Sequence, residues 1–341
     1  MLWYDRCVYI PLQQLRMLLL GWIPFSIGDI AYIVAGGWLL VTVIRWVVYL
    51  VKRGACLPLL YASLLNCLNT ILLGYLSFLV AWGIHYDKIS LREHWQLTDN
   101  GYTEASRNER RVMDSTAMVS YETLLVDSLN AYAPRYATLS FEETERRALK
   151  YYNQYTDCPM KRFGLSIKPT LFGMFLERMA VEGYYNPFSG EGQVNTGLSQ
   201  FMLPFVVCHE MAHQAGIAAE DDANLMAYAL GTSVDDPSFR YSAYLNIWFY
   251  THGRVRRRDS VMAKRFYAQL NNLTKAHIDT LEKISEQYHH EVAEYSSELY
   301  DSYLRLQNQK DGIRSYSNVA RSAWLLEEQR RSTGHRIISM P

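Results

Sequence analysis

Residues 201–216 read FMLPFVVCHEMAHQAG, an apolar run followed by the pattern H-E-x-x-H and a glycine. In a helix, His209 and His213 are one turn apart and project from the same face, so two imidazoles can bind one zinc ion, Zn2+. Glu210 then lies beside the metal. There it can take a proton from a zinc-activated water and act as a general base. The stretch therefore predicts the zinc-binding helix of a metallopeptidase.

A second helical pattern starts almost at once after Gly216 and opens with the acidic residues 220–222. Glu220 is the best third ligand, because a tight helix-turn-helix folds the first turn of this helix back towards the two histidines. Asp221 and Asp222 point to other faces and are the alternatives. Asn224 lies one turn after Glu220 and can hydrogen-bond a metal ligand.

The same residues have a purely structural interpretation. The histidines can be ordinary core residues, and the acidic residues can simply stabilise a helix N-terminus. A different function is also open, that of a non-catalytic membrane sensor or scaffold with a structural metal or a peptide-binding site. Glu210 favours catalysis over this alternative, because a structural metal site has no use for a base.

Catalysis of peptide hydrolysis also needs a donor for the transition-state oxyanion. We call the H-E-x-x-H pattern of residues 209–213 the zinc motif. The nearest candidate donors after it in the chain are Tyr241, Tyr244 and His252, although each is also a plausible packing residue. Cys208 directly precedes the motif, but its side chain leaves the helix in a different direction from the histidines, which favours a buried core residue.

Composition excludes several classes of protein. The 341 residues carry 34 basic and 34 acidic side chains, so no positive field favours nucleic acid as a partner. The five cysteines are scattered and form no C-x-x-C pair, so no disulfide framework is indicated.

Segment 30–84 contains two runs, 30–51 and 57–84, that are apolar and long enough to cross a lipid bilayer. A pair of buried helices in a soluble domain is the alternative. Lys52 and Arg53 lie between the runs, and positive residues favour the cytoplasmic side. We therefore expect a multi-pass protein of the bacterial inner membrane with everything after residue 84 in the periplasm. Segment 1–29 mixes arginines with aromatic and aliphatic residues and is expected to lie at the membrane interface.

The region 85–330 is expected to form the extracytoplasmic domain, mainly helical, with short strands and turns between residues 165 and 196. An edge strand just before the zinc motif can pair with an extended peptide substrate, and a plain surface hairpin is the alternative. Segment 331–341 is expected to be a polar tail with little means of ordering itself.

Several stretches together resemble a family of bacterial, largely Bacteroidetes, membrane proteins called domain of unknown function 3810, which is similar to zincin metallopeptidases. The matching stretches are 23–29, 81–86, 184–191, 203–213, 220–224, 239–242 and 311–316. The resemblance implies a mainly α (α+β zincin-like) fold with two N-terminal transmembrane helices and a helical metallopeptidase-like domain with a small sheet. It also implies a gluzincin-like site in which His209, His213 and Glu220 bind zinc and Glu210 is the base.

Two features depart from the family pattern. Asp222 stands where members usually have glutamate, which argues against that position as the indispensable ligand. Members also tend to carry a further N-terminal transmembrane helix, and this chain begins after it.

Overall fold

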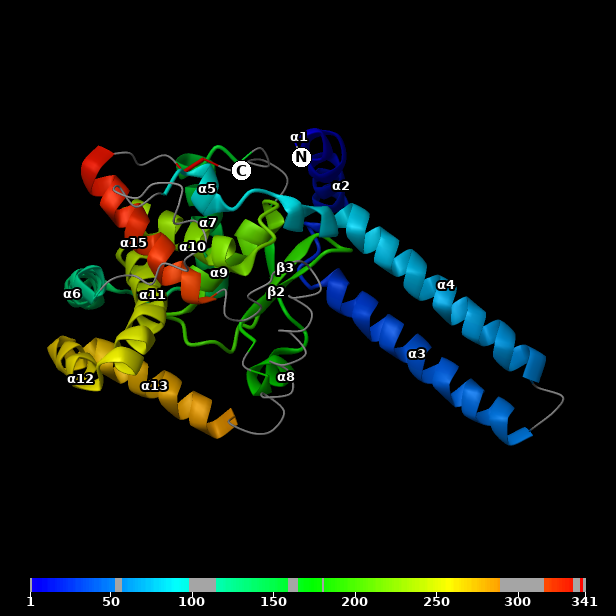
Figure 1. The fold of residues 1–341 in the computed structure, drawn as a ribbon. Coiled ribbons are helices and arrows are strands. Elements are labelled where there is room, and N and C mark those ends of the chain that lie inside the picture. The colour runs from blue at the N-terminus through cyan, green and yellow to red at the C-terminus, as the bar shows by residue number, and fades with distance from the viewer. Residues whose placement is uncertain are drawn as a thin grey trace.

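The computed structural model describes residues 2–52, 57–97, 115–158, 165–179, 181–288, 316–333 and 338–339. Most of these residues are helical, and they surround a small three-stranded sheet. Two long helices leave this helical domain side by side (Figure 1). The predicted fold class, mainly α with a small sheet and two N-terminal apolar helices, is confirmed.

The two long helices are α3, Ile27–Lys52, and α4, Leu57–Ala81. Both are long and apolar enough to cross a membrane, and only 17% and 11% of the residues in their most apolar windows are buried. A core helix of a soluble domain would be mostly buried, so the exposed apolar surfaces favour membrane contact. By length and composition, α3 and α4 are therefore candidate membrane spans. A short 3-10 helix, η2, Gly83–Asp87, follows α4.

The N-terminal segment consists of α1, Leu2–Tyr4, the π-helix η1, Asp5–Tyr9, and α2, Ile10–Leu20. One face of it belongs to the core of the helical domain. The Tyr9 hydroxyl donates to the Gln214 carbonyl over 2.9 Å, and Gln13 Nε2 donates to the Gly190 carbonyl over 2.7 Å. The expectation of an interfacial segment was therefore incomplete, since this segment also packs against the zinc motif.

The sheet contains β1, Ile167–Pro169, β2, Gly183–Asn186, and β3, Glu191–Val194, in the order β1-β3-β2. β1 runs parallel to β3, with Ile167 opposite Gly192, and β2 runs antiparallel to β3, with Gly183 opposite Val194. β2 is thus an edge strand of the sheet. The strands lie within the region where the sequence predicts them.

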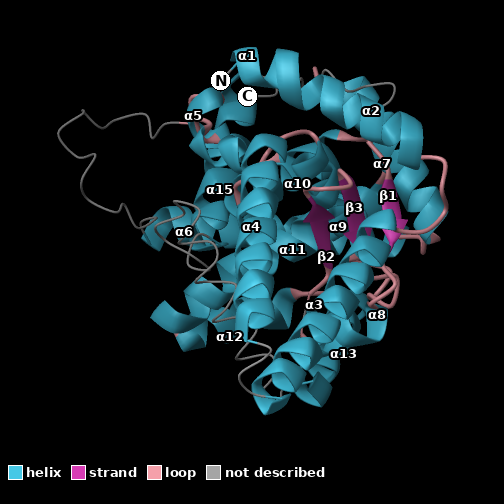
Figure 2. Ribbon diagram, turned by 90° about the vertical axis from the view of Figure 1, so that its right-hand side faces the viewer, coloured by secondary structure: helices cyan, strands magenta, loops and turns pink. Residues whose placement is uncertain are grey.

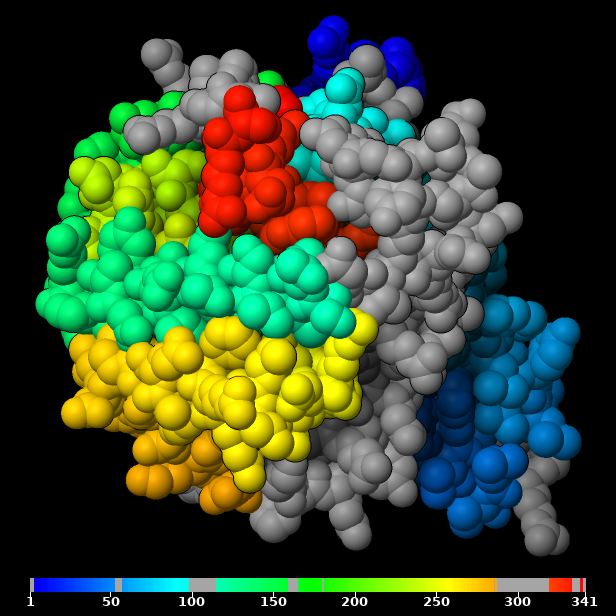
Figure 3. Space-filling view, turned by 60° about the vertical axis from the view of Figure 1, so that its left-hand side comes forward, coloured from blue at the N-terminus to red at the C-terminus, as the bar shows by residue number. Residues whose placement is uncertain are grey.

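The other helices of the domain pack around α9, α10 and α11; the residues of α9 and α10 are almost all buried, and half of those of α11 are. Figure 3 shows α6, α12 and α15 covering the side turned away from α3 and α4. The Ser140 hydroxyl caps α7 by accepting from the Glu143 amide. The bounds are α5 Leu91–His94, α6 Ser115–Tyr132, η4 Ala133–Arg135, α7 Phe141–Tyr155, α8 Gly173–Arg178, α9 Leu203–Gln214, α10 Glu220–Ser233, α11 Pro237–Arg258, α12 Ser260–Gln269, α13 Asn272–Tyr288 and α15 Tyr316–Thr333.

Part of the segment expected to be a polar tail, residues 331–333 and 338–339, is described and has defined contacts. α15 continues to Thr333, and further on Ile338 is buried and forms a parallel bridge with Thr156. The Ser339 carbonyl also accepts from Trp95 Nε1 over 2.7 Å. Two backbone hydrogen bonds, from the Ile338 amide to the Tyr155 carbonyl and from the Asp157 amide to the Ile338 carbonyl, hold Ile338 beside the end of α7.

Candidate metal centre

The zinc motif lies on α9, with Pro204 in the first turn, where its missing N–H is not needed. The helix ends at Gly216, whose φ of 91° suits glycine best. The Gly216 amide donates to the His213 carbonyl and the Ile217 amide donates to the Ala212 carbonyl, which is the Schellman arrangement. This termination turns the chain back so that α10 starts beside the histidines.

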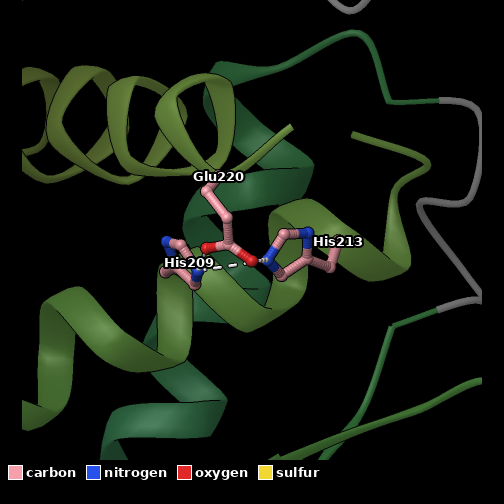
Figure 4. A group of neighbouring side chains, drawn as sticks. All are labelled: His209, His213 and Glu220. Carbon is pink, nitrogen blue, oxygen red and sulfur yellow. Dashed lines mark hydrogen bonds and ion pairs between the residues drawn. The ribbon is translucent and has the colours of Figure 1, made fainter. Parts of the chain in front are cut away.

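The turn brings three ligand atoms together (Figure 4). His209 Nε2 and His213 Nε2 are 3.1 Å apart, and they lie 3.3 Å and 3.6 Å from the two oxygens of Glu220. Glu220 comes from the first turn of α10, and the histidines come from one face of α9. The three residues that the sequence predicts as ligands are therefore neighbours in the structure.

These distances fit a zinc ion. Ligand atoms that lie 2.0–2.1 Å from a tetrahedral zinc are about 3.3–3.4 Å from one another. Two imidazole nitrogens and a carboxylate facing one point also form the kind of mixed ligand set that zinc accepts in catalytic sites with three protein ligands. The donor chemistry and the spacing of this cluster both suit one zinc ion.

Neighbouring groups orient the ligands. His213 Nδ1 lies 2.7 Å from the Ile217 carbonyl, so in the neutral ring this nitrogen carries the proton and the lone pair of Nε2 faces the cluster. Asn224 Nδ2 donates to the Glu220 carbonyl over 2.8 Å, and the Asn224 side chain also interacts with His209. Asn224 therefore lies where the sequence predicts an outer partner of the ligands.

The electrostatics of the cluster also favour a cation. Burial lowers the pKa of His213, but the charge and hydrogen bond of Glu220 outweigh this and raise it to about 9. Burial raises the pKa of Glu220, but the two histidines hold it well below its usual range. Glu220 thus stays ionised and draws positive charge to the site.

Glu210 is buried behind the ligands, with a relative exposure of 3%, and its Oε2 has no hydrogen-bond partner among the described residues. Burial, and then the charges of Glu220 and Glu182, raise its pKa to about 8. β2 packs directly on Glu210, because a Cβ on Gly183 would lie 2.7 Å from Glu210 Oε1. A buried carboxyl group with an elevated pKa, next to three ligands, has the environment of a catalytic acid or base.

Two further residues belong to the surroundings of the site, and sequence reasoning missed both. Burial raises the pKa of Glu182, at the start of β2, to about 7, and its charge acts on Glu210. Burial raises the pKa of Tyr250 on α11 above its ordinary value, and the charges of Glu182 and Glu220 add to that shift. Tyr250 is thus a hydroxyl within electrostatic reach of the candidate ligands.

The three oxyanion candidates from the sequence have other partners. The Tyr241 hydroxyl lies 2.8 Å from His277 Nδ1, and Tyr244 stacks on Tyr132 with ring centroids 5.8 Å apart. His252 Nδ1 lies 2.7 Å from a carboxylate oxygen of the buried Glu122. These contacts match the packing interpretation of all three residues.

The alternative ligands also lie apart from the cluster. Asp222 is buried beside the start of α5, where the backbone of Leu91 and Arg92 interacts with it, and burial raises its pKa to about 8. Cys208 is fully buried, its carbonyl accepts from the Tyr152 hydroxyl over 2.7 Å, and burial raises the pKa of its thiol. Glu220 is thus the acidic residue in the first turn of α10 that belongs to the cluster with His209 and His213.

The segment after α4 packs against the zinc motif. The ring centroid of Trp82, the residue after α4, lies 6.1 Å from that of His213. Lys88 Nζ donates to the Gly216 carbonyl over 3.2 Å, and this lysine also pairs with Asp5 at 3.0 Å. The end of a candidate membrane span and the N-terminal segment therefore brace the turn that positions the ligands.

Fold and site together define a mainly helical protein with two candidate membrane spans and a candidate metal centre. The chain belongs to the family described as protein of unknown function (DUF3810), whose model matches residues 4–322. This confirms the resemblance at the level of the family. No curated protein and no solved structure matches the chain.

Proposed function

We propose that the chain is a membrane-anchored zinc metallopeptidase, a hydrolase of the gluzincin kind that cleaves peptide bonds in a peptide or protein substrate. The cluster of His209, His213 and Glu220 beside the buried Glu210 carries this proposal. A structural metal site needs ligands alone, whereas hydrolysis also needs a base next to them. The placement of Glu210 therefore supports an enzyme.

His209, His213 and Glu220 would hold the metal. A bound zinc ion supplies Lewis acidity towards the scissile carbonyl and lowers the pKa of water. Glu210 takes the proton of the attacking water and delivers it to the leaving amine. Its pKa of about 8 is that of the site without a metal ion, and the positive charge of a bound ion would lower it further than His213 does. Glu210 is then ionised and ready to accept a proton at neutral pH.

Two elements around the cluster suit a peptide substrate. β2 is an edge strand that packs on Glu210, so an extended peptide that pairs with it would lie next to the base. The Tyr250 hydroxyl is within electrostatic reach of Glu220, and we assign it the role of oxyanion donor, for which the sequence suggests Tyr241, Tyr244 or His252.

The proposal includes the membrane. α3 and α4 would cross the bacterial inner membrane, which makes the protein multi-pass, and the domain that carries the metal centre would lie in the periplasm. Lys52 and Arg45 lie near the end of α3 that is remote from the domain, and positive residues favour the cytoplasmic side. This orientation agrees with that bias.

The test is peptide cleavage by the purified full-length chain in detergent, loaded with zinc. The full chain is needed because the N-terminal segment and Trp82 contact the zinc motif. We expect the parent to cleave unstructured peptides and Glu210→Gln to lose about 10²–10⁴-fold of the rate while zinc stays bound. Asp221→Asn is the matched control, because it removes a charge next to Glu220 without touching the cluster.

A zinc-loaded parent that cleaves no peptide would contradict the proposal. Such a result would favour the non-catalytic sensor or scaffold. Equal rates for the parent and Glu210→Gln would contradict the assignment of the base.

A further inference from the structure

Exposed apolar side chains gather on the helical domain around the point where α3 begins. We call six of them the apolar collar. Leu19 and Trp22 lie at and just after the end of α2, and Phe188 lies in the turn between β2 and β3. The other three are Leu171, in the segment that leads into α8, and Met174 and Phe175 in α8 itself. Met174 is 81% exposed and Trp22 is 77% exposed. A group of large apolar side chains that are this exposed is unusual on a soluble domain.

Direct contacts fix the collar to the first turn of α3. The Leu171 amide donates to Asp29 Oδ2 over 2.7 Å, and the Tyr184 hydroxyl donates to the other oxygen of Asp29. The turn that carries Phe188 packs on Gly28, where a Cβ would lie 2.5 Å from Asn186 Nδ2. The collar therefore has a defined position relative to the candidate span.

The α2 side of the collar is held in a similar way. Lys168 Nζ donates to the Leu20 carbonyl over 2.8 Å and forms a buried ion pair of 2.5 Å with Glu191. A Glu191 oxygen in turn accepts from the Gly28 amide over 2.7 Å. The start of α3, the end of α2 and the sheet thus form one connected junction.

Figure 2 looks onto the face from which α3 and α4 leave, and it shows α2 and α8 next to α3. Exposed apolar side chains also follow Asp29 along α3, beginning with Ile30 and Ile33. Tryptophan and phenylalanine at the end of an apolar span are typical of the boundary between lipid and water. A peptide substrate or a second copy of the chain would not explain why the apolar surface continues along α3.

We propose that the apolar collar inserts into the surface of the lipid bilayer and seats the domain on the membrane. Apolar side chains of such a surface enter the boundary between headgroups and acyl chains by about 5–10 Å. The candidate metal centre would then lie close to the bilayer, since the ring of Trp82, the residue that follows α4, lies 6.1 Å from the ring of His213. The inference rests on the proposed membrane anchoring and does not depend on the proposed peptidase activity.

The test uses an environment-sensitive fluorophore on single added cysteines in the full chain, with Cys7→Ser and Cys56→Ser so that the remaining native thiols are the three buried ones. Met174→Cys reports on the collar, and Val41→Cys in α3 reports on anchoring. Val261→Cys is the matched control, because this apolar side chain is 59% exposed and belongs to α12, which lies on the side of the domain remote from α3 (Figure 1).

Each variant is placed in vesicles of phosphatidylethanolamine and phosphatidylglycerol, with and without lipids that carry a nitroxide either near the headgroup, for position 174, or deep in the acyl chain, for position 41. We expect a blue shift and quenching at positions 174 and 41, and neither at position 261. Quenching at 41 without quenching at 174 would overturn the collar and leave the anchoring intact. No quenching at either position would overturn both.

Discussion

Gly183→Ala is the sharpest test of how the sheet positions the proposed base. The added Cβ would lie 2.7 Å from Glu210 Oε1 and 2.8 Å from the Gln193 carbonyl. The carbonyl belongs to the backbone of the neighbouring strand, so it cannot move without disturbing the pairing of β2 and β3. Overpacking of this kind costs about 1–3 kcal/mol of folding free energy.

The effect on activity follows from the contact with Glu210. The variant keeps His209, His213 and Glu220, so we expect it to bind zinc as the parent does. Glu210 must give way to the new methyl group, and a displacement of about 1 Å in a catalytic group can cost about 10²-fold in rate. We therefore expect a lower Tm, an unchanged zinc content and a strong loss of peptide cleavage.

Gly253→Ala is the control for Gly183→Ala. Its Cβ would meet only Arg257 Nη1, at 3.7 Å, among the described residues, and alanine inside a helix is favoured over glycine by about 1 kcal/mol. This control should equal or exceed the parent in Tm and match it in cleavage. The reasoning is refuted if Gly183→Ala, with zinc bound, cleaves peptide at the parental rate.

Three further predictions concern residues around the site. Tyr250→Phe should lower the cleavage rate by about 10²-fold with zinc retained, because one oxyanion donor is lost, and Tyr241→Phe should not; steady-state kinetics decides. Lys168→Ala should lower stability by about 3–5 kcal/mol in denaturant titration, since it leaves the Glu191 charge buried without its partner. Burial raises the pKa of Glu182 to about 7, so its contribution to stability is present at acid pH and is lost as pH rises through 7. Glu182→Gln should therefore weaken the pH dependence of the Tm of the zinc-free protein.

The candidate metal ligands could be predicted from the sequence mainly because the patterns that indicate them are local. H-E-x-x-H fixes two histidines on one helical face, and Gly216 with the acidic start of α10 fixes the turn that returns Glu220 to them. These relations involve residues close together in the chain. For the same reason, the two apolar helices could be predicted from their length and composition.

Contacts between distant parts of the chain could not be predicted in this way. Tyr250 follows Tyr241 by nine residues, which turns it by about 180° around α11, so closeness in sequence to the candidate ligands does not tell which face of α11 is turned towards them. The contact of Gly183 with Glu210 depends on how the sheet packs on α9. The N-terminal segment meets the zinc motif through Tyr9 and Gln214, which are 205 positions apart.

The most direct test of the central claim is the zinc content of the purified full-length chain and its variants, measured by elemental analysis. The account predicts about one zinc ion per chain in the parent and in Asp221→Ala, and a loss of zinc in His213→Ala and Glu220→Ala. A folded parent without zinc after exposure to the ion would contradict the account. Full zinc content in Glu220→Ala would contradict the third ligand.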